Sequence, residues 1–265
     1  MFEIFSLSLI QGLTEFLPVS SSGHLILLPT LLGWQDHSLE IDGILHFGTL
    51  CSVCCYFYKD IFQMIRHFFG YYLKLGRSRD PFHARLAFTI IIATFPVVIA
   101  GFLLKRIGIE VVRSPSINAV MLILGGIFLY AADRFAQKNQ TLQGMTFGKA
   151  LIIGLFQVIS LIPGSSRSGM CLTGARLLGF DRVSATRYAF LLAIPAILGA
   201  SLLIFMDASK EGIQTPLLDL SLYFSLSFLF GLAAIHFMIT FLQRHSLLIF
   251  ALYRIFLGGI ILWLL

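Results

Sequence analysis

The stretch G-L-T-E-F-L-P-V-S-S-S-G-H, residues 12–24, interrupts an apolar region with a proline, three consecutive serines, a glycine and a histidine. Polar groups that lack a partner in hydrocarbon cost several kcal/mol each, so this cluster requires a structural or chemical reason. A related stretch, G-L-F-Q-V-I-S-L-I-P-G-S-S-R-S-G at residues 154–169, lies in the second half of the chain. The sequence therefore contains a divergent internal repeat, and each copy carries a polar break.

The composition is that of an integral membrane protein. Hydrophobic residues make up 57% of the 265 residues and charged residues only 12%. The net charge of +6 does not indicate a nucleic-acid partner, because Lys and Arg lie in short segments between apolar runs, where they orient the protein in the bilayer. We therefore expect the lipid bilayer, and no nucleic acid, among the partners.

Six segments are long and apolar enough to cross a bilayer of about 30 Å as helices. They are residues 43–62, 85–104, 117–135, 184–206, 218–242 and 247–265. Two further apolar regions, 2–33 and 147–179, are broken near the middle by Pro, Ser and Gly, which leaves halves too short to span. Irregular backbone at membrane depth is tolerated only where protein buries it or it lines a wet cavity. We predict an all-α polytopic membrane protein with six transmembrane helices and two re-entrant helical hairpins.

The two halves of this single domain, about residues 1–140 and 141–265, are predicted to be inverted repeats. Each half would hold one hairpin, which returns to its own side, and three spans, so the second half begins on the opposite face. Most Lys and Arg residues between the spans then fall on one face, which we assign to the cytoplasm. The first hairpin would enter from the external side, and the two breaks would meet near the midplane in a site open to the outside.

Each break precedes a new apolar helical stretch, which begins near Gly23 in the first copy and near Gly169 in the second. Serines are common N-caps, and capping alone is the structural explanation for them. Helix N-termini also present free backbone N–H groups and a positive dipole end, so two converging N-termini form a phosphate receptor. Arg167 adds a planar guanidinium for bidentate phosphate binding. The candidate phosphate-binding residues are Ser20, Ser22, Gly23, Ser165, Ser166, Ser168 and Gly169.

Glu15, Ser21 and His24 lie within ten residues of one another and would share the site with Arg167. A carboxylate, a hydroxyl, an imidazole and a guanidinium are the components of a phosphoryl-transfer site. The structural alternative is a buried ion pair between Arg167 and Glu15 that only locks the hairpins together. Gln11 and Glu15 are four residues apart, so on a helix they share a face and offer oxygens to Mg²⁺ or Ca²⁺, which we expect to bind mainly with substrate.

Other polar residues in the apolar segments are expected to be structural. We predict packing or interhelical hydrogen bonds for His46 and His236, and a carbonyl or carboxylate partner for Arg254. Aromatic and basic residues alternate over residues 61–79, which is typical of an amphipathic segment on the cytoplasmic membrane surface.

The two breaks resemble the signature motifs of the bacterial undecaprenyl-diphosphate phosphatase family, of the bacitracin-resistance type. Further similarity lies in L-H-F-G-T-L at Leu45, R-Y-A-F-L-L-A-I-P at Arg187 and F-A-L-Y-R-I at Phe250, so it covers nearly the whole chain. The resemblance implies hydrolysis of undecaprenyl diphosphate to undecaprenyl phosphate and inorganic phosphate. This reaction recycles the lipid carrier for peptidoglycan and other envelope polymers and confers bacitracin resistance. The implied location is the bacterial cytoplasmic (inner) membrane, and a homodimer is compatible with it.

By position, the resemblance implies catalytic roles for Glu15, Ser21, His24 and Arg167. Gln11 stands where relatives often have Glu, and Cys171 stands where they usually have Thr. Either Ser21 is the nucleophile with His24 as its base, or His24 activates water or attacks directly; the spacing does not distinguish these.

Three rival functions deserve comparison. Inverted repeats with broken helices are also typical of transporters, so a flippase or carrier for prenyl phosphate is the main alternative. The other large class of membrane lipid phosphatases requires S-R-x5-H-x3-D, and Thr173 occupies its histidine position, which excludes it. A purely structural scaffold leaves Arg167 and its polar neighbours without a purpose.

Overall fold

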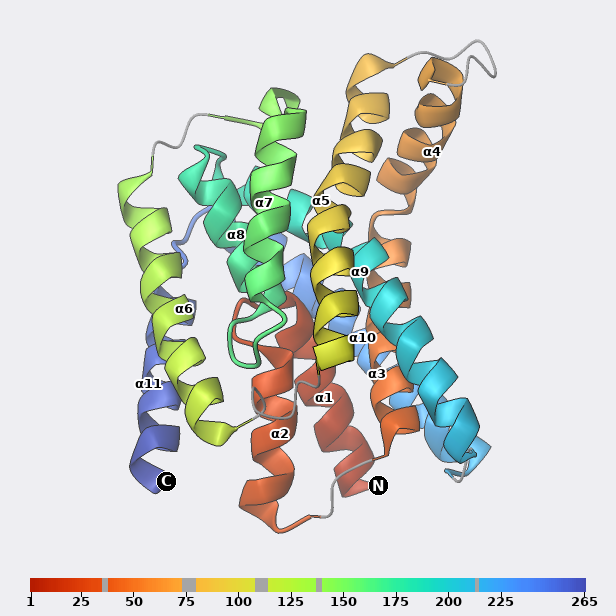
Figure 1. The fold of residues 1–265 in the computed structure, drawn as a ribbon, viewed down its shortest axis with the longest axis vertical. Helices are drawn as coiled ribbons and strands as arrows, with labels where there is room; N and C mark the ends of the chain where they lie inside the picture. Colours follow the sequence, from red (N-terminus) through yellow and green to blue (C-terminus); the bar gives the residue numbers. More distant parts are fainter. Residues whose placement is uncertain (35–37, 73–79, 108–113, 137–139, 213–214) are drawn as a thin grey trace.

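The computed structural model describes residues 1–34, 38–72, 80–107, 114–136, 140–212 and 215–265, which form a bundle of helices (Figure 1). The helices are α1 (Phe2–Phe16), α2 (Ser21–Leu32), α3 (Leu39–Tyr56), α4 (Tyr58–Tyr72), α5 (Pro81–Ile107), α6 (Pro115–Phe135), the 3₁₀ turn η2 (Leu142–Gly144), α7 (Phe147–Ile159), α8 (Arg167–Leu177), α9 (Arg182–Glu211), α10 (Leu217–Leu242) and α11 (Leu248–Leu264). Within these described ranges the chain forms no β-strand, and the all-α prediction is confirmed.

The long apolar helices confirm a polytopic membrane protein. Four of the described helices, α5, α6, α9 and α10, contain segments long and apolar enough to cross a bilayer, and α3 with α4 makes a fifth if the bent pair is one span. The span predicted for 247–265 corresponds to α11, whose 17 residues extend about 25 Å, less than the hydrocarbon thickness of about 30 Å.

The span predicted for residues 43–62 is divided, because the chain bends by 76° between α3 and α4. Phe57, at the bend, is buried with its ring 6.4 Å from that of Phe190 on α9. About one helical turn further along the chain, Asp60 Oδ1 accepts a hydrogen bond from Arg187 Nη2, also on α9, at 2.8 Å. Both contacts come from a distant part of the chain, so the bend has no local sequence signal.

Both interrupted regions form helix pairs, α1–α2 and α7–α8, that enter the bundle from opposite ends (Figure 1). Their breaks, residues 17–20 and 160–166, lie in the middle of the molecule (Figure 1). The two pairs have matching neighbours, since α10 packs along α1 and α5 packs along α7. The core therefore surrounds two polar turns at mid-height.

The two breaks end in the same cap geometry. Ser20 and Ser166 both have positive φ, 76° and 68°, which is unusual for a residue other than glycine. Ser20 Oγ accepts the Gly23 N–H at 3.3 Å, and Ser166 Oγ accepts the Gly169 N–H at 3.1 Å. These caps fix the first turns of α2 and α8, as the serine pattern predicted.

The segment 61–79 is only partly described, because residues 73–79 lie outside the described residues. Over the described part, α4 is amphipathic and packs along α5. Tyr58, Phe62, Ile65 and Phe69 form an exposed apolar stripe on it. Such a face is compatible with the membrane surface expected for this segment.

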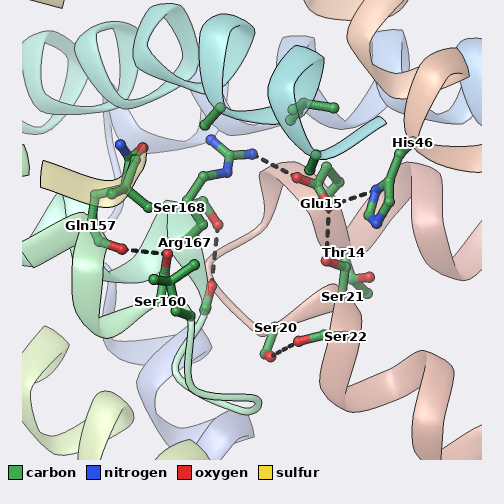
Figure 2. Close-up of a pocket in the computed structure, with 16 residues that line it drawn as sticks. Thr14, Glu15, Ser20, Ser21, Ser22, His46, Gln157, Ser160, Arg167 and Ser168 are labelled. Carbon is green, nitrogen blue, oxygen red and sulfur yellow. Dashed lines mark hydrogen bonds and ion pairs between the residues drawn. The ribbon is translucent and has the colours of Figure 1, made fainter. Parts of the chain in front are cut away.

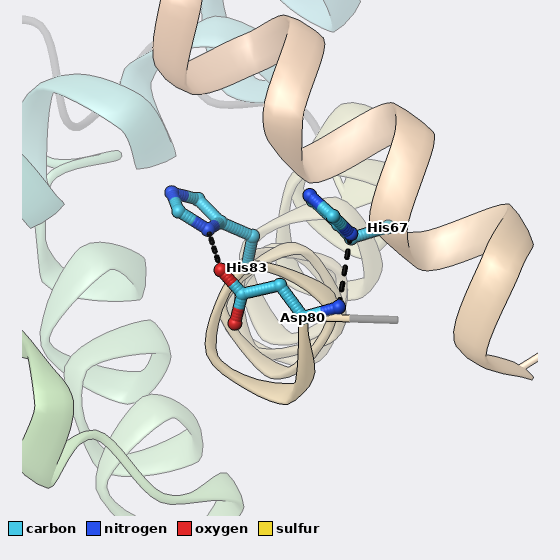
Figure 3. A group of neighbouring side chains, drawn as sticks. All are labelled: His67, Asp80 and His83. Atoms are coloured by element: carbon cyan, nitrogen blue, oxygen red, sulfur yellow. Dashed lines mark hydrogen bonds and ion pairs between the residues drawn. The ribbon is translucent and has the colours of Figure 1, made fainter. Parts of the chain in front are cut away.

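Asp80 caps the start of α5 and joins it to α4 (Figure 3). Its Oδ1 accepts the Phe82 N–H at 2.8 Å, its Oδ2 lies 2.6 Å from His83 Nδ1, and its own N–H donates to His67 Nδ1 at 3.0 Å. The hydrogen bond from His83 is the main cause of a lowered pKa for the Asp80 carboxyl. One potential metal-ligand atom of each residue lies within 4.8 Å of the others, but helix capping already accounts for this arrangement.

Candidate active site

A cavity of about 220 Å³ lies where the two breaks meet (Figure 2). One wall is polar and comes mainly from the breaks and the helices beside them. It consists of Thr14, Glu15, Ser20, Ser21, Ser22, His46, Gln157, Ser160, Ser166, Arg167 and Ser168. The other wall is apolar and is formed by Val97, Leu161, Ala196, Ile197 and Ala200. The cavity is thus amphipathic, with its apolar part between α5 and α9.

Glu15 is the residue at which the two breaks are joined. Its Oε1 accepts a hydrogen bond from Arg167 Nη2 at 2.7 Å, and its Oε2 accepts one from Ser21 Oγ at 2.8 Å (Figure 2). Ser21 is the first residue of α2, and Arg167 is the first residue of α8. Both side chains are nearly buried, with Glu15 7% and Arg167 13% exposed. One carboxylate therefore holds a cation and a hydroxyl at the starts of two converging helices.

The backbone of both breaks is tied together by hydrogen bonds. Ser168 Oγ on α8 donates to the Leu17 carbonyl at 3.0 Å, across the two breaks. The Oγ atoms of Ser20 and Ser22 are 3.4 Å apart, and those of Ser166 and Ser168 are 3.2 Å apart. Of the predicted serines, Ser20, Ser21, Ser22, Ser166 and Ser168 line the cavity, in two similar turns. Ser165, Gly23 and Gly169 do not line it, and Ser165 Oγ donates to the Ile162 carbonyl instead.

Arg254 on α11 binds both breaks and is fully buried. It donates to the carbonyl of Pro18 in the first break at 3.4 Å, and to those of Gly164 and Ser165 in the second at 3.1 and 2.7 Å. It also donates to two carbonyls of α6. A carbonyl partner was predicted for this residue, and the prediction is confirmed. The arrangement makes Arg254 a structural cation.

His24 does not line the cavity. Its Nδ1 is 2.7 Å from the Ser20 carbonyl, which requires a proton on Nδ1, and its Nε2 is 2.6 Å from the hydroxyl of Tyr253 on α11. In the neutral ring, Nε2 therefore accepts from Tyr253. The structure brings Ser21 to Glu15 and His24 to Tyr253, rather than Ser21 to His24.

Four polar cavity residues were not among the predicted site residues: Thr14, His46, Gln157 and Ser160. His46, on α3, has its Nδ1 2.6 Å from Gln11 Nε2, so the predicted interhelical hydrogen bond is confirmed, but the residue also lines the cavity. The signal for Gln157 was its place in the repeat, since it follows G-L-F as Glu15 follows G-L-T. His236 hydrogen-bonds Tyr56 at 3.1 Å, as expected for an interhelical contact.

The environment of Gln11 bears on the expected divalent ion. Its amide nitrogen donates to Glu15 Oε2 at 3.1 Å and to His46 Nδ1, which leaves its Oε1 buried and without a partner among the described residues. The Glu15 carboxylate and the Gln11 amide oxygen are ligands of the kind that Mg²⁺ and Ca²⁺ prefer, although the amide presents its nitrogen, and not its oxygen, to Glu15 here. The residues present therefore fit a hard cation in chemical type.

The fold and this site define a helical membrane protein whose two broken helix pairs meet at a buried acid–arginine pair. The family described as "Bacitracin resistance protein BacA" matches residues 4–260, and the chain belongs to this family. A protein of Alteromonas mediterranea named "Undecaprenyl-diphosphatase" is 40% identical over 263 residues, which cover 99% of this chain and 98% of the relative. A Geotalea daltonii protein of the same name is 40% identical over 260 residues, covering 97% and 96%.

Proposed function

We propose that the protein hydrolyses undecaprenyl diphosphate to undecaprenyl phosphate and inorganic phosphate. The activity named for both relatives supports this. The observation that carries the proposal is the Glu15 carboxylate, which holds Ser21 and Arg167 at two converging helix N-termini. A nucleophile, a guanidinium and two dipole ends at one point match the needs of phosphoryl transfer. The reaction recycles the lipid carrier of envelope polymers and would explain bacitracin resistance.

Ser21 is the proposed nucleophile, because its hydroxyl already donates to a carboxylate. The incoming diphosphate competes with Glu15 for Arg167, and a carboxylate released from the guanidinium becomes a better proton acceptor. Ser21 Oγ then attacks the terminal phosphorus, its proton passes to Glu15, and the bond to the prenyl phosphate oxygen breaks. Water cleaves the resulting phosphoserine and releases inorganic phosphate. In this mechanism His24 stabilises α2 through its hydrogen bonds to Ser20 and Tyr253. In the alternative mechanism His24 activates the attacking water.

A divalent ion, Mg²⁺ or Ca²⁺, is proposed to enter with the diphosphate, held by Glu15 and Gln11. Bound there, it would share the negative charge of the phosphate oxygens. A single carboxylate holds such an ion weakly, so substrate oxygens would complete its coordination. Titration of activity against a chelator tests this, and full activity in metal-free protein would contradict it.

The apolar wall suits the prenyl chain of the substrate. Val97 lies on α5, while Ala196, Ile197 and Ala200 lie on α9, so the lipid would leave the cavity between these helices. The small side chains of Ala196 and Ala200 leave room there for the methyl-branched isoprene units. The polar head would stay at the two breaks.

The proposed topology has six transmembrane helices and two re-entrant hairpins as inverted repeats in the cytoplasmic membrane. The opposite entry of α1–α2 and α7–α8 supports it. In this topology the α1–α2 side is external and the cavity opens outward. Single cysteines at Ser38 and at Ser78, in a cysteine-free background, should react with an impermeant maleimide from outside and inside respectively. The opposite labelling pattern would show that the protein has the reverse orientation in the membrane.

The decisive experiment is phosphate release from undecaprenyl diphosphate by the purified protein, with Ser21→Ala and Arg167→Ala beside it. Release should be lost in both variants, and a phosphorylated Ser21 should be trapped in the wild-type protein at short times. A prenyl-phosphate carrier is the weaker alternative, since it has no need of a hydroxyl aimed at a carboxylate. Wild-type protein that binds the lipid and releases no phosphate would favour the carrier. Cross-linking in vesicles would test the homodimer.

A further inference from the structure

Gln157 is a fully buried side chain in the cavity wall, and the mechanism above does not use it. It lies near the end of α7, one turn before the second break. Its Oε1 accepts a weak hydrogen bond from the Cys171 thiol on α8, with a sulfur–oxygen distance of 3.7 Å. Its Nε2, in contrast, has no hydrogen-bond partner in the described part of the chain. The amide thus has one end anchored and one donor end unused.

A buried donor without an acceptor destabilises the folded protein, so such groups in native proteins call for an explanation. Gln157 borders a cavity, and a molecule inside the cavity can supply the acceptor. The occupant has to supply a hydrogen-bond acceptor, because the amide nitrogen only donates. A phosphate group, with several anionic oxygens, is the strongest acceptor that a lipid diphosphate offers.

The internal repeat places Gln157 opposite Glu15. Gly12 begins G-L-T-E and Gly154 begins G-L-F-Q, so the amide and the carboxylate occupy equivalent positions on α1 and α7. Figure 2 shows them on either side of Arg167. A second carboxylate would repel a phosphate, whereas the neutral amide does not repel it and can donate a hydrogen bond to it. The two copies of the repeat therefore offer different chemistry on the two walls.

We propose that Gln157 Nε2 binds the prenyl-side phosphate of the substrate, next to the terminal phosphate at Ser21 and Arg167. This assignment rests on the proposed function. Ser21 is held by Glu15, so the attacked phosphate lies on the Glu15 side of Arg167, and the second phosphate lies on the Gln157 side. Leu161 and Val97 also line the cavity, and the prenyl chain continues from the second phosphate along this apolar wall.

Farnesyl phosphate tests the assignment, because it carries only the prenyl-side phosphate. We would measure its dissociation constant by calorimetry with the full-length protein in nanodiscs, with farnesol as the probe that lacks phosphate. In Gln157→Ala, the constant for farnesyl phosphate should rise about tenfold, since a hydrogen bond to a charged group is worth about 1.5–3 kcal/mol and 1.4 kcal/mol is tenfold. Gln157→Glu should weaken binding further, and farnesol should bind all variants equally.

Cys171→Ser is the matched control, because it keeps a donor for Gln157 Oε1 and leaves Nε2 untouched; it should bind farnesyl phosphate like the wild type. Unchanged affinity in Gln157→Ala would overturn the proposal. An equal loss for farnesol would also overturn it, since that would show a collapse of the apolar wall. The binding assay needs no turnover, so failure of the proposed hydrolysis would appear separately, as absent phosphate release from wild-type protein.

Discussion

Arg167 Nη2 on α8 and Glu15 Oε1 on α1 are 2.7 Å apart, although 152 residues separate them in the chain. This ion pair is the contact that converts two separate helix breaks into one cavity. It admits two functions, a structural lock between the hairpins and a charge pair that substrate opens. Substituting one or both of these residues distinguishes the two functions.

Arg167→Ala alone should unfold part of the site, because removing one member of a buried ion pair leaves an uncompensated charge and costs about 3–5 kcal/mol. The double variant Glu15→Gln with Arg167→Gln removes both charges, so its melting temperature in detergent should return toward that of the wild type. Phosphate release should stay abolished in both. If the double variant regained both stability and hydrolysis, the Glu15–Arg167 ion pair would have only a structural role.

Arg254 is predicted to matter for stability rather than chemistry, because it donates to carbonyls of both breaks and touches no group that reacts. Arg254→Lys retains the charge but cannot reach Pro18, Gly164 and Ser165 together. We expect a loss of about 2 kcal/mol or more in unfolding free energy, since buried carbonyls lose their donors. Thermal melting checks this, with the exposed Arg244→Lys as the control. A stable but inactive Arg254→Lys would instead indicate a direct role in binding.

Tyr253→Phe tests what His24 does. The variant removes only the hydroxyl that donates to His24 Nε2 at 2.6 Å and keeps the parallel ring contact. If His24 only supports α2, turnover should fall by less than about fivefold and its pH profile should keep its shape, since one neutral hydrogen bond is worth about 1 kcal/mol and about 1.36 kcal/mol is tenfold in rate. A shifted acidic limb of the profile would show that the imidazole titrates in the reaction.

The sequence anticipated the two breaks because their causes are local. Pro, Ser and Gly in an apolar run interrupt a helix whatever the helix packs against. Ser20 and Ser166 each cap the next helix by accepting the backbone N–H of the residue three positions later. The partner of Arg167 was also accessible, since few groups near a buried guanidinium can neutralise it, and Glu15 was one of them.

Features that depend on contacts between distant helices were not accessible from the sequence. The bend at Phe57 is held by Arg187 from α9, and the direction of His24 is set by Tyr253 from α11. The repeat pairs Gln157 with Glu15, but a glutamine suits a buried helix as well as a phosphate site, so only the packing of α7 shows that it lines the cavity.

Asp80 offers a test of the α4–α5 connection away from the cavity. Its pKa is lowered in the folded protein, chiefly by the hydrogen bond from His83. A carboxyl with a depressed folded pKa stabilises the protein fully above its unfolded pKa and loses this effect as the pH falls through the folded value. Asp80→Ala should therefore lower stability by about 1 kcal/mol at pH 7, as expected for a lost N-cap, and the gap to the wild type should shrink below about pH 3.8. Thermal melting at pH 7 and below about pH 3.8 measures this difference in stability.

Phosphate release at pH 7 should be unaffected in Asp80→Ala, since Asp80 does not line the cavity. A loss of activity in this variant would mean that the α4–α5 hairpin acts on the site.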